Sequence, residues 1–186
     1  MNAFKKIGLT IFLLFTASCG AERPTSEEAP LSKQSECVIG FENNQPCHLE
    51  LNSKALEIEV VLQDVFEDEK RLDEIIVLTH HKKYSLKIPT ETFLMDGDKG
   101  HISINDINFD GAPDIAVTTS FRTANLYLDY WVYDPSSESF HYIGNLPSLE
   151  IDTSTQSITS TERLNAVDYK KSQWIWQGNT LVKKSN

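Results

Sequence analysis

The sequence predicts an all-β domain whose antiparallel strands form a meander, with a β-sandwich as the alternative arrangement. Apolar and polar residues alternate with a period of two over short runs, as in Leu56-Glu-Ile-Glu-Val60, which is the spacing of a strand with one buried face. Gly, Pro, Asn, Asp and Ser separate these runs, and no segment carries a long apolar stripe of helical period. With 186 residues, 40% of them hydrophobic, the chain can bury one core, so we expect one folded domain.

Residues 1–18 have the layout of a bacterial lipoprotein signal peptide. Lys5 and Lys6 precede an apolar stretch that ends in small residues directly before Cys19, and this stretch is too short for a stable membrane span. The sequence Phe15-Thr-Ala-Ser-Cys19 resembles the lipobox, in which the cysteine is acylated and becomes the first mature residue. The resemblance implies an exported protein anchored through Cys19 in the outer membrane and facing the periplasm. Ordinary signal cleavage without a lipid is the alternative.

Residues 19–35 are polar, contain two prolines and have no periodic apolar face. We predict that they form a disordered tether and that the domain occupies residues 36–186. The remaining thiols are Cys37 and Cys47, which flank a segment containing Gly, Asn and Pro that can turn back on itself. In an oxidising compartment they are expected to form a disulfide that pins a hairpin, the alternative being two free thiols.

Alternating runs after residue 50 are predicted as strands, and turn residues lie between them. The predicted strands are 56–60, 74–79, 84–88, 101–105, 115–119, 126–133, 140–143, 157–162, 167–176 and 181–184. Asp134-Pro-Ser-Ser137 is expected to be the turn of a hairpin.

Residues 64–73 are similar to residues 106–114, and an apolar run follows each segment. This spacing fits the period of about 40 to 50 residues of propeller blades, each a small antiparallel sheet. We therefore expect a small or partial β-propeller-like domain. For residues 64–73 a solvated charged turn is the simpler interpretation.

One segment carries the pattern of a cation-binding loop. Asp106, Asn108, Asp110 and Asp114 stand at relative positions 1, 3, 5 and 9, and Gly111 stands at position 6. Calcium takes about six to eight oxygen ligands, and this spacing lets a tight loop direct several side chains at one point. Glycine at position 6 permits the sharp backbone turn.

The backbone carbonyl of Ala112 is the expected further ligand. Position 12 is Val117, so no bidentate glutamate closes the site, and Asp114 must close it directly or through water. Because strand-like runs flank the loop, we predict a structural calcium ion that holds a β-hairpin together. A metal-free turn is the alternative, since turns also favour Asp, Asn and Gly, and magnesium is the less suitable cation.

The segment Asn108-Phe-Asp-Gly-Ala-Pro-Asp-Ile-Ala-Val117 resembles the calcium loop of FG-GAP-type propeller repeats. Residues 130–142, 158–163 and 174–181 are similar, in order, to segments of a family of small periplasmic lipoproteins. Some members of that family are immunity proteins that inhibit lysozyme-like peptidoglycan hydrolases delivered by rival cells through a type IV secretion system. The resemblance covers residues 100–184 and implies a propeller-like fold, a calcium ion in this loop and a secreted hydrolase as partner.

The net charge argues against nucleic-acid binding, and the motifs present argue against catalysis. Seventeen Lys and Arg residues against 27 Asp and Glu residues give a net charge of −10, which leaves no basic surface for nucleic acid. The five histidines lie outside any known catalytic or zinc motif. His80-His-Lys-Lys83 is interpreted as an exposed hairpin turn. We therefore expect a protein that is not an enzyme.

Two functions stay open. The first is a protein-binding inhibitor of a peptidoglycan hydrolase, with the loop 120–125 as candidate contact through Arg122 and Asn125. The second is a calcium-stabilised envelope lipoprotein with a structural or adhesive role. Acidity and a lipid anchor suit both.

Overall fold

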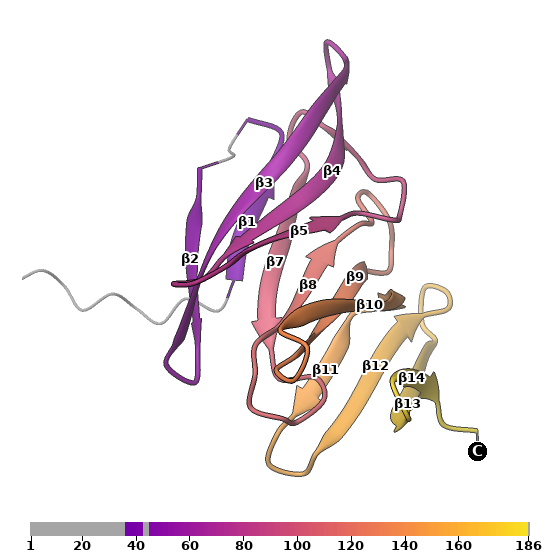
Figure 1. The fold of residues 1–186 in the computed structure, drawn as a ribbon. Coiled ribbons are helices and arrows are strands. Elements are labelled where there is room, and N and C mark those ends of the chain that lie inside the picture. The colour runs from indigo at the N-terminus through magenta and orange to yellow at the C-terminus, as the bar shows by residue number, and fades with distance from the viewer. Residues whose placement is uncertain (1–35, 43–44, 186) are drawn as a thin grey trace, which may run out of the picture. The chain divides into compact units, whose positions relative to one another are not determined.

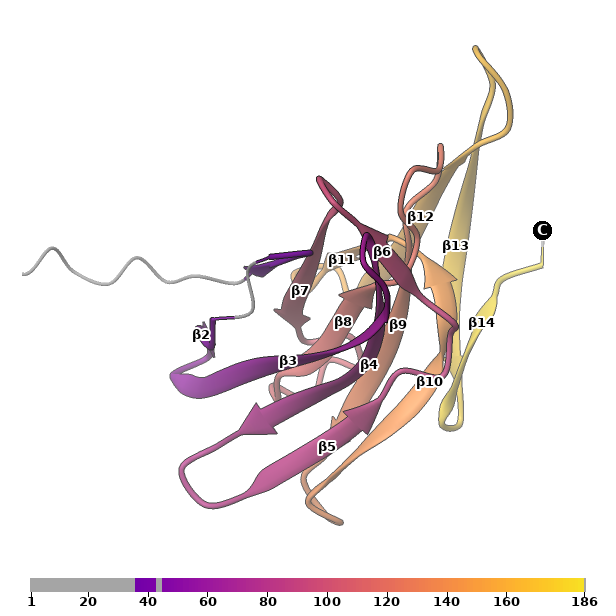
Figure 2. The same ribbon diagram turned by 90° about the horizontal axis from the view of Figure 1, so that it is seen from above.

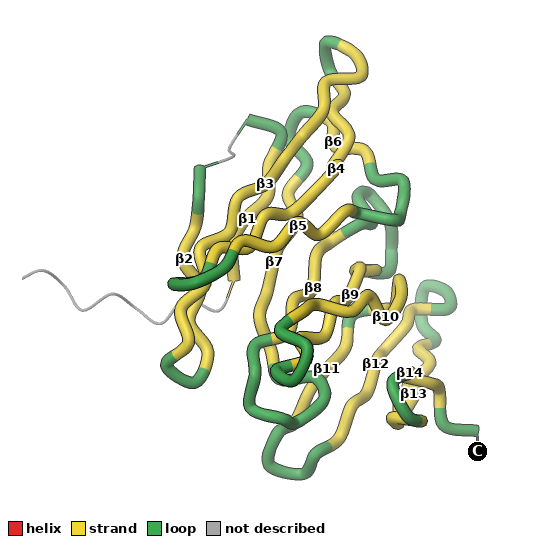
Figure 3. The backbone as a smooth tube through the Cα atoms, viewed as in Figure 1, coloured by secondary structure: helices red, strands yellow, loops and turns green. Residues whose placement is uncertain are grey.

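The computed structural model describes residues 36–42 and 45–185. The predicted signal peptide, the acylation site Cys19 and the tether lie outside these residues. Over the described residues every regular element is a β-strand (Figure 3), and the strands form three antiparallel sheets, which confirms the predicted all-β class. No helix in this part of the chain is long and apolar enough to cross a membrane.

The middle sheet contains the strands that flank the predicted calcium loop (Figure 1). Its order is β1 (Glu36–Gly40), β7 (Lys99–Asn105), β8 (Asp114–Thr118), β9 (Tyr127–Asp134) and β10 (Ser139–Pro147). Every residue of β8 is buried. Ile115 and Val117 belong to one hydrophobic cluster and Ala116 to another, because successive side chains of a strand point to opposite faces. Both faces of this sheet are therefore covered.

One face packs on the first sheet, which consists of β2 (Cys47–Leu51), β3 (Lys54–Phe66), β4 (Glu69–Leu78) and β5 (Lys83–Lys87), with β6 (Phe93–Met95) paired to β4. Ile58, Ile75 and Val77 from this sheet share a core with Ile102 and Ile115 from the middle sheet. The alternation read from the sequence places these residues on one face.

The other face of the middle sheet packs on the last sheet, whose order is β11 (Leu149–Asp152), β12 (Ser157–Arg163), β13 (Tyr169–Gln177) and β14 (Thr180–Lys183). Ile158, Trp174 and Leu181 pack here with Leu128 and Tyr130 of β9. The domain is thus three stacked sheets with two apolar cores.

The two similar segments lie in comparable places. Residues 64–73 form the end of β3, its turn and the start of β4, and residues 106–114 connect β7 to β8 and form the first position of β8. Each pair of strands occupies the second and third positions of its sheet. The first segment is an extended hairpin and the second a compact loop, so the similarity extends to topology but not to local conformation.

The disulfide between Cys37 and Cys47 is present, with the two Cα atoms 6.1 Å apart. Its predicted role was wrong in one respect. Cys37 lies on β1, which pairs with β7, whereas Cys47 lies on β2, which pairs with β3. The bond therefore joins the middle sheet to the first sheet instead of pinning the two arms of one hairpin.

Candidate functional site

The candidate calcium loop connects two neighbouring strands of the middle sheet. Asn105 at the end of β7 lies opposite Asp114 at the start of β8, so the loop closes a β-hairpin, as the flanking runs predict. Its backbone takes positive φ angles at Phe109 and Gly111, 62° and 80°. The left-handed conformation carries little strain at Gly111, because glycine has no Cβ atom.

Hydrogen bonds curl the loop around one carboxylate. The two oxygens of Asp106 accept the N–H groups of Asp110 and Gly111, each at 2.9 Å. Asn108 Oδ1 also accepts the Asp110 N–H at 3.1 Å, and Asn108 Nδ2 donates to Asp110 Oδ2 at 2.9 Å. The side chains at positions 1, 3 and 5 are thereby held together at one side of the loop.

The residue at position 9, Asp114, is fully buried. Its Oδ2 accepts the Ile107 N–H at 2.7 Å, and its Oδ1 accepts the Tyr133 N–H from β9 at 2.8 Å. Burial raises the pKa of Asp114 to about 7, against the opposing effect of these N–H donors, and the carboxylate of Asp110 raises it further. None of the ion pairs between described residues involves Asp106, Asp110 or Asp114.

The donor set of the loop is chemically suited to a hard cation. It consists of the oxygens of Asp106, Asn108, Asp110 and Asp114, and a carboxylate oxygen that accepts one N–H keeps a second lone pair. The predicted carbonyl ligand, Ala112, is buried, and its N–H donates to Asp110 Oδ1 at 2.7 Å. Over residues 36–42 and 45–185, no three His, Cys, Asp or Glu side chains already stand in a metal-binding arrangement.

The loop also contacts both outer sheets. Trp176 Nε1, on β13, donates to the Ile107 carbonyl at 3.1 Å, and Lys54 Nζ, on β3, donates to the Gly111 carbonyl at 3.1 Å. Asn108 and Asp110 line a cavity of about 450 Å³ between the loop and Trp176. A cation can therefore approach the loop from solvent, and the loop links all three sheets.

The candidate contact residues Arg122 and Asn125 lie in the connection between β8 and β9. The Arg122 guanidinium donates to the Asp98 carboxylate, so a partner's carboxylate would have to compete with Asp98. Asn125 forms two hydrogen bonds with the backbone of Arg163, donating to its carbonyl at 3.1 Å and accepting its N–H at 2.7 Å. The contact loop is thus joined to the β12–β13 hairpin.

Sequence reasoning missed the tip of that hairpin. Leu164, Val167 and Tyr169 are 63%, 80% and 61% exposed, and Figure 2 shows the tip projecting beyond the neighbouring strands. The alternating pattern assigned Val167 to a strand, but β13 begins only at Tyr169. The available signal was an apolar valine beside the turn residues Asn165 and Asp168.

Comparison with protein-family descriptions, with curated proteins and with solved structures found no match in any of the three.

Proposed function

We propose that this chain is an envelope lipoprotein that binds and inhibits a peptidoglycan hydrolase, stabilised by a structural calcium ion in the Asp106–Asp114 loop. The observation that carries the binding role is the β12–β13 tip. Exposed apolar side chains that cluster on a projecting element are typical of a protein contact site. The hydrolase as partner class rests on the sequence resemblance, and the anchor rests on the lipobox.

The apolar tip is held in one conformation by its own polar residues. Asn165 Oδ1 accepts the N–H groups of Val167 and Asp168 at 3.0 and 2.9 Å. Arg163 Nε donates to the Asn165 carbonyl at 2.8 Å, and the Leu164 N–H donates to the Asp168 carbonyl at 2.9 Å. A contact element that is ordered before binding loses less conformational entropy in the complex, so these bonds favour affinity.

Charge at the hairpin also fits the proposed partner. Arg163, Lys170 and Lys171 lie on β12 and β13 next to the tip, although the chain as a whole has a net charge of −10. Catalytic clefts of glycoside hydrolases contain paired carboxylates. The hairpin also carries Glu162 and Asp168, so residues 162–171 have an excess of one positive charge, and this excess favours contact with the acids of such a cleft.

Val167→Asp is expected to abolish most of the inhibition. The substitution places a charge at the apolar centre of the proposed contact, so the concentration of the domain that halves hydrolase activity should rise by about tenfold or more. The measurement is lysis of purified peptidoglycan by a panel of lysozyme-like hydrolases, with and without the domain.

Phe66→Asp is the matched control, because Phe66 is 68% exposed at the end of β3, in the β3–β4 hairpin. It should leave inhibition unchanged. Equal loss in both variants would refute the β12–β13 surface. The structural or adhesive role would be favoured over inhibition if the wild-type domain inhibits no hydrolase of the panel and co-purifies with envelope components.

The calcium proposal is supported by the buried charge of the loop. Asp114 has no cationic partner among the described residues and lies close to Asp110, whose charge raises its pKa. Buried carboxylates are ordinarily paired or bound to a metal. A divalent cation at the loop would neutralise this repulsion and would supply structural cross-linking rather than chemistry.

Free calcium is expected to raise the melting temperature of the domain, since a ligand that binds only the folded state stabilises it. At about ten times the Kd the gain is about 1.4 kcal/mol, or roughly 3 to 6 °C. Asp110→Ala should remove the response. Asp152→Ala should keep it, because Asp152 accepts comparable turn bonds from Ser154 and Thr155 outside the loop. If chelator leaves the wild-type melting temperature unchanged, the loop is a metal-free turn.

A further inference from the structure

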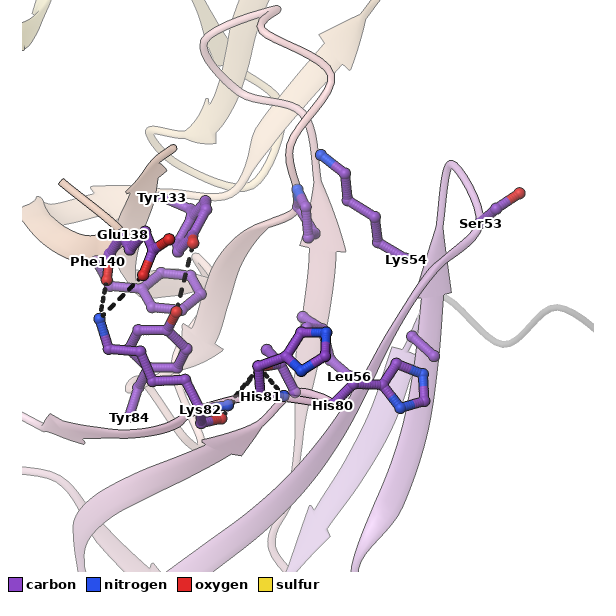
Figure 4. A pocket seen from close by; sticks show the side chains of 13 residues that line it. Ser53, Lys54, Leu56, His80, His81, Lys82, Tyr84, Tyr133, Glu138 and Phe140 are labelled. Carbon is purple, nitrogen blue, oxygen red and sulfur yellow. Dashed lines mark hydrogen bonds and ion pairs between the residues drawn. The ribbon is translucent and has the colours of Figure 1, made fainter. Parts of the chain in front are cut away.

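A second cavity lies between the first and middle sheets, and Pro113 of the Asp106–Asp114 loop is part of its lining. Its volume is about 470 Å³, and it is bounded by the β2–β3 turn, the β4–β5 turn and the β9–β10 hairpin (Figure 4). Small-molecule sites commonly measure about 300 to 1,000 Å³. The cavity is large enough for a ligand with a single ring.

Three aromatic rings form one wall of this cavity. Tyr84 meets Phe140 and Tyr133 edge to face, with ring centroids 5.1 and 6.0 Å apart, and the rings of Tyr133 and Phe140 lie 5.0 Å apart. The Tyr84 and Tyr133 hydroxyls are 3.3 Å apart. Rings that support one another in this way form a rigid surface on which the face of another ring can pack.

The rim of the cavity is basic in an otherwise acidic protein. Lys54, His80, His81 and Lys82 line it, and Glu138 is its one acid. Lys82 Nζ is already close to Glu138, donating to its carbonyl at 2.6 Å and lying 3.9 Å from its carboxylate. The other three bases have no carboxylate partner in the ion pairs of the described residues.

Lys54 is the cation best placed to receive a ligand anion. Its Nζ contacts only a neutral acceptor, the Gly111 carbonyl at 3.1 Å, and Figure 4 shows its side chain extending across the cavity from the turn that carries Ser53. The His80 and His81 rings line the cavity from the β4–β5 turn, with their centroids 6.3 Å apart. An anion between these groups would gain donors from two sides.

We propose that this cavity binds a carboxylate carried on a six-membered ring, with the ring against Tyr84 and its aromatic neighbours and the carboxylate between Lys54 and the histidines. The lining includes no arginine, the residue that pairs with phosphate through two parallel bonds. An acidic sugar and an aryl carboxylate share the proposed chemistry. The site is separate from the β12–β13 surface and does not depend on hydrolase inhibition.

Titration of the isotope-labelled domain with glucuronate and with benzoate, followed by backbone amide NMR shifts, tests the proposal. Saturable shifts at Ala55, His81 and Tyr84 are expected for at least one probe, with a Kd on the order of 1 mM. The stronger of the two probes identifies the ring as sugar or aryl. Glucose and benzyl alcohol, which keep the rings but lack the carboxylate, should bind at least about fivefold more weakly.

Lys54→Gln should weaken binding of the preferred probe at least about fivefold, whereas Lys99→Gln, at an exposed lysine on β7, should leave it unchanged. Melting curves establish that both variants are folded. The proposal is overturned if neither acidic probe gives saturable shifts at these amides of the wild-type domain when the probe concentration reaches about 20 mM, roughly twenty times the expected Kd. It is also overturned if the neutral analogues bind equally well, or if Lys99→Gln weakens binding as much as Lys54→Gln.

Discussion

Asp114→Ala is expected to lower the free energy of unfolding by about 2 to 4 kcal/mol, even in the presence of chelator. The substitution leaves the N–H groups of Ile107 and Tyr133 without their acceptor, and each unsatisfied buried donor costs about 1 to 3 kcal/mol. Because the donors of both bonds are backbone N–H groups of the protein itself, unfolding measured with chelator present reports the structural role of this carboxylate separately from the proposed calcium binding. Urea unfolding at pH 7 with chelator present measures it.

Asp114→Asn and Asp152→Ala provide the comparison. Asparagine keeps one acceptor oxygen and turns a donor toward the second N–H. The free energy of unfolding of Asp114→Asn should therefore lie between that of the wild type and that of Asp114→Ala. Asp152 accepts hydrogen bonds in an exposed turn, where water can replace it, so Asp152→Ala should be much milder. Equal losses for Asp114→Ala and Asp152→Ala would mean that water satisfies the two N–H groups.

Replacing Cys37 and Cys47 together by alanine is expected to lower the free energy of unfolding by about 3 kcal/mol. The cysteines are 10 residues apart in sequence, and a cross-link of that span removes unfolded-state entropy worth roughly 2.7 kcal/mol. Loss of the buried Cys37 side chain from the core adds to this. Denaturant unfolding of the oxidised wild type and of the double variant measures the difference.

Because the Cys37–Cys47 disulfide joins the first and middle sheets, its removal should affect the strands that it connects more than the rest of the domain. Amide hydrogen exchange should accelerate most in β1 and β2, whereas β12 and β13 in the last sheet should keep their protection. Reductant should destabilise the wild type and leave the double variant unchanged. If the double variant unfolds at the same denaturant concentration as the oxidised wild type, the bond contributes nothing to stability.

Local sequence patterns were sufficient to predict the strands with a clear alternation of apolar residues. β12 lies where the period of two places it, whereas the predicted strands 56–60 and 74–79 cover only parts of β3 and β4, which include residues 54–66 and 69–78. The turn at residues 134–137 joins β9 to β10, with Asp134 accepting the Ser136 N–H. β1, β2, β6 and β11 were not predicted. Each has five residues or fewer, too few for alternation to stand out, and β1 and β6 pair with strands that are not their chain neighbours.

The candidate sites also differ in how far the sequence could predict them, because one is contiguous in the chain and the other is not. The Asp106–Asp114 loop is a contiguous motif, so its hairpin could be predicted from the sequence alone, and its role as a calcium site stays a prediction. Its contacts with Lys54 and Trp176 could not, because they come from β3 and β13 in the two outer sheets. The basic and aromatic cavity has no contiguous signal at all, since its lining comes from three separate hairpins and one position of the loop.

The pairing of β1 with β7 has a consequence for how the domain folds. Glu36 on β1 lies opposite Ser103 on β7. The strands of the first sheet lie between β1 and β7 in the sequence, so β1 can pair with β7 only after the whole first sheet has been synthesised. Contacts this distant in sequence require closure of a long chain segment and are typical of slowly folding topologies. Until β1 pairs with it, β7 presents an unpaired edge, so the chain is most exposed to aggregation at this stage of folding.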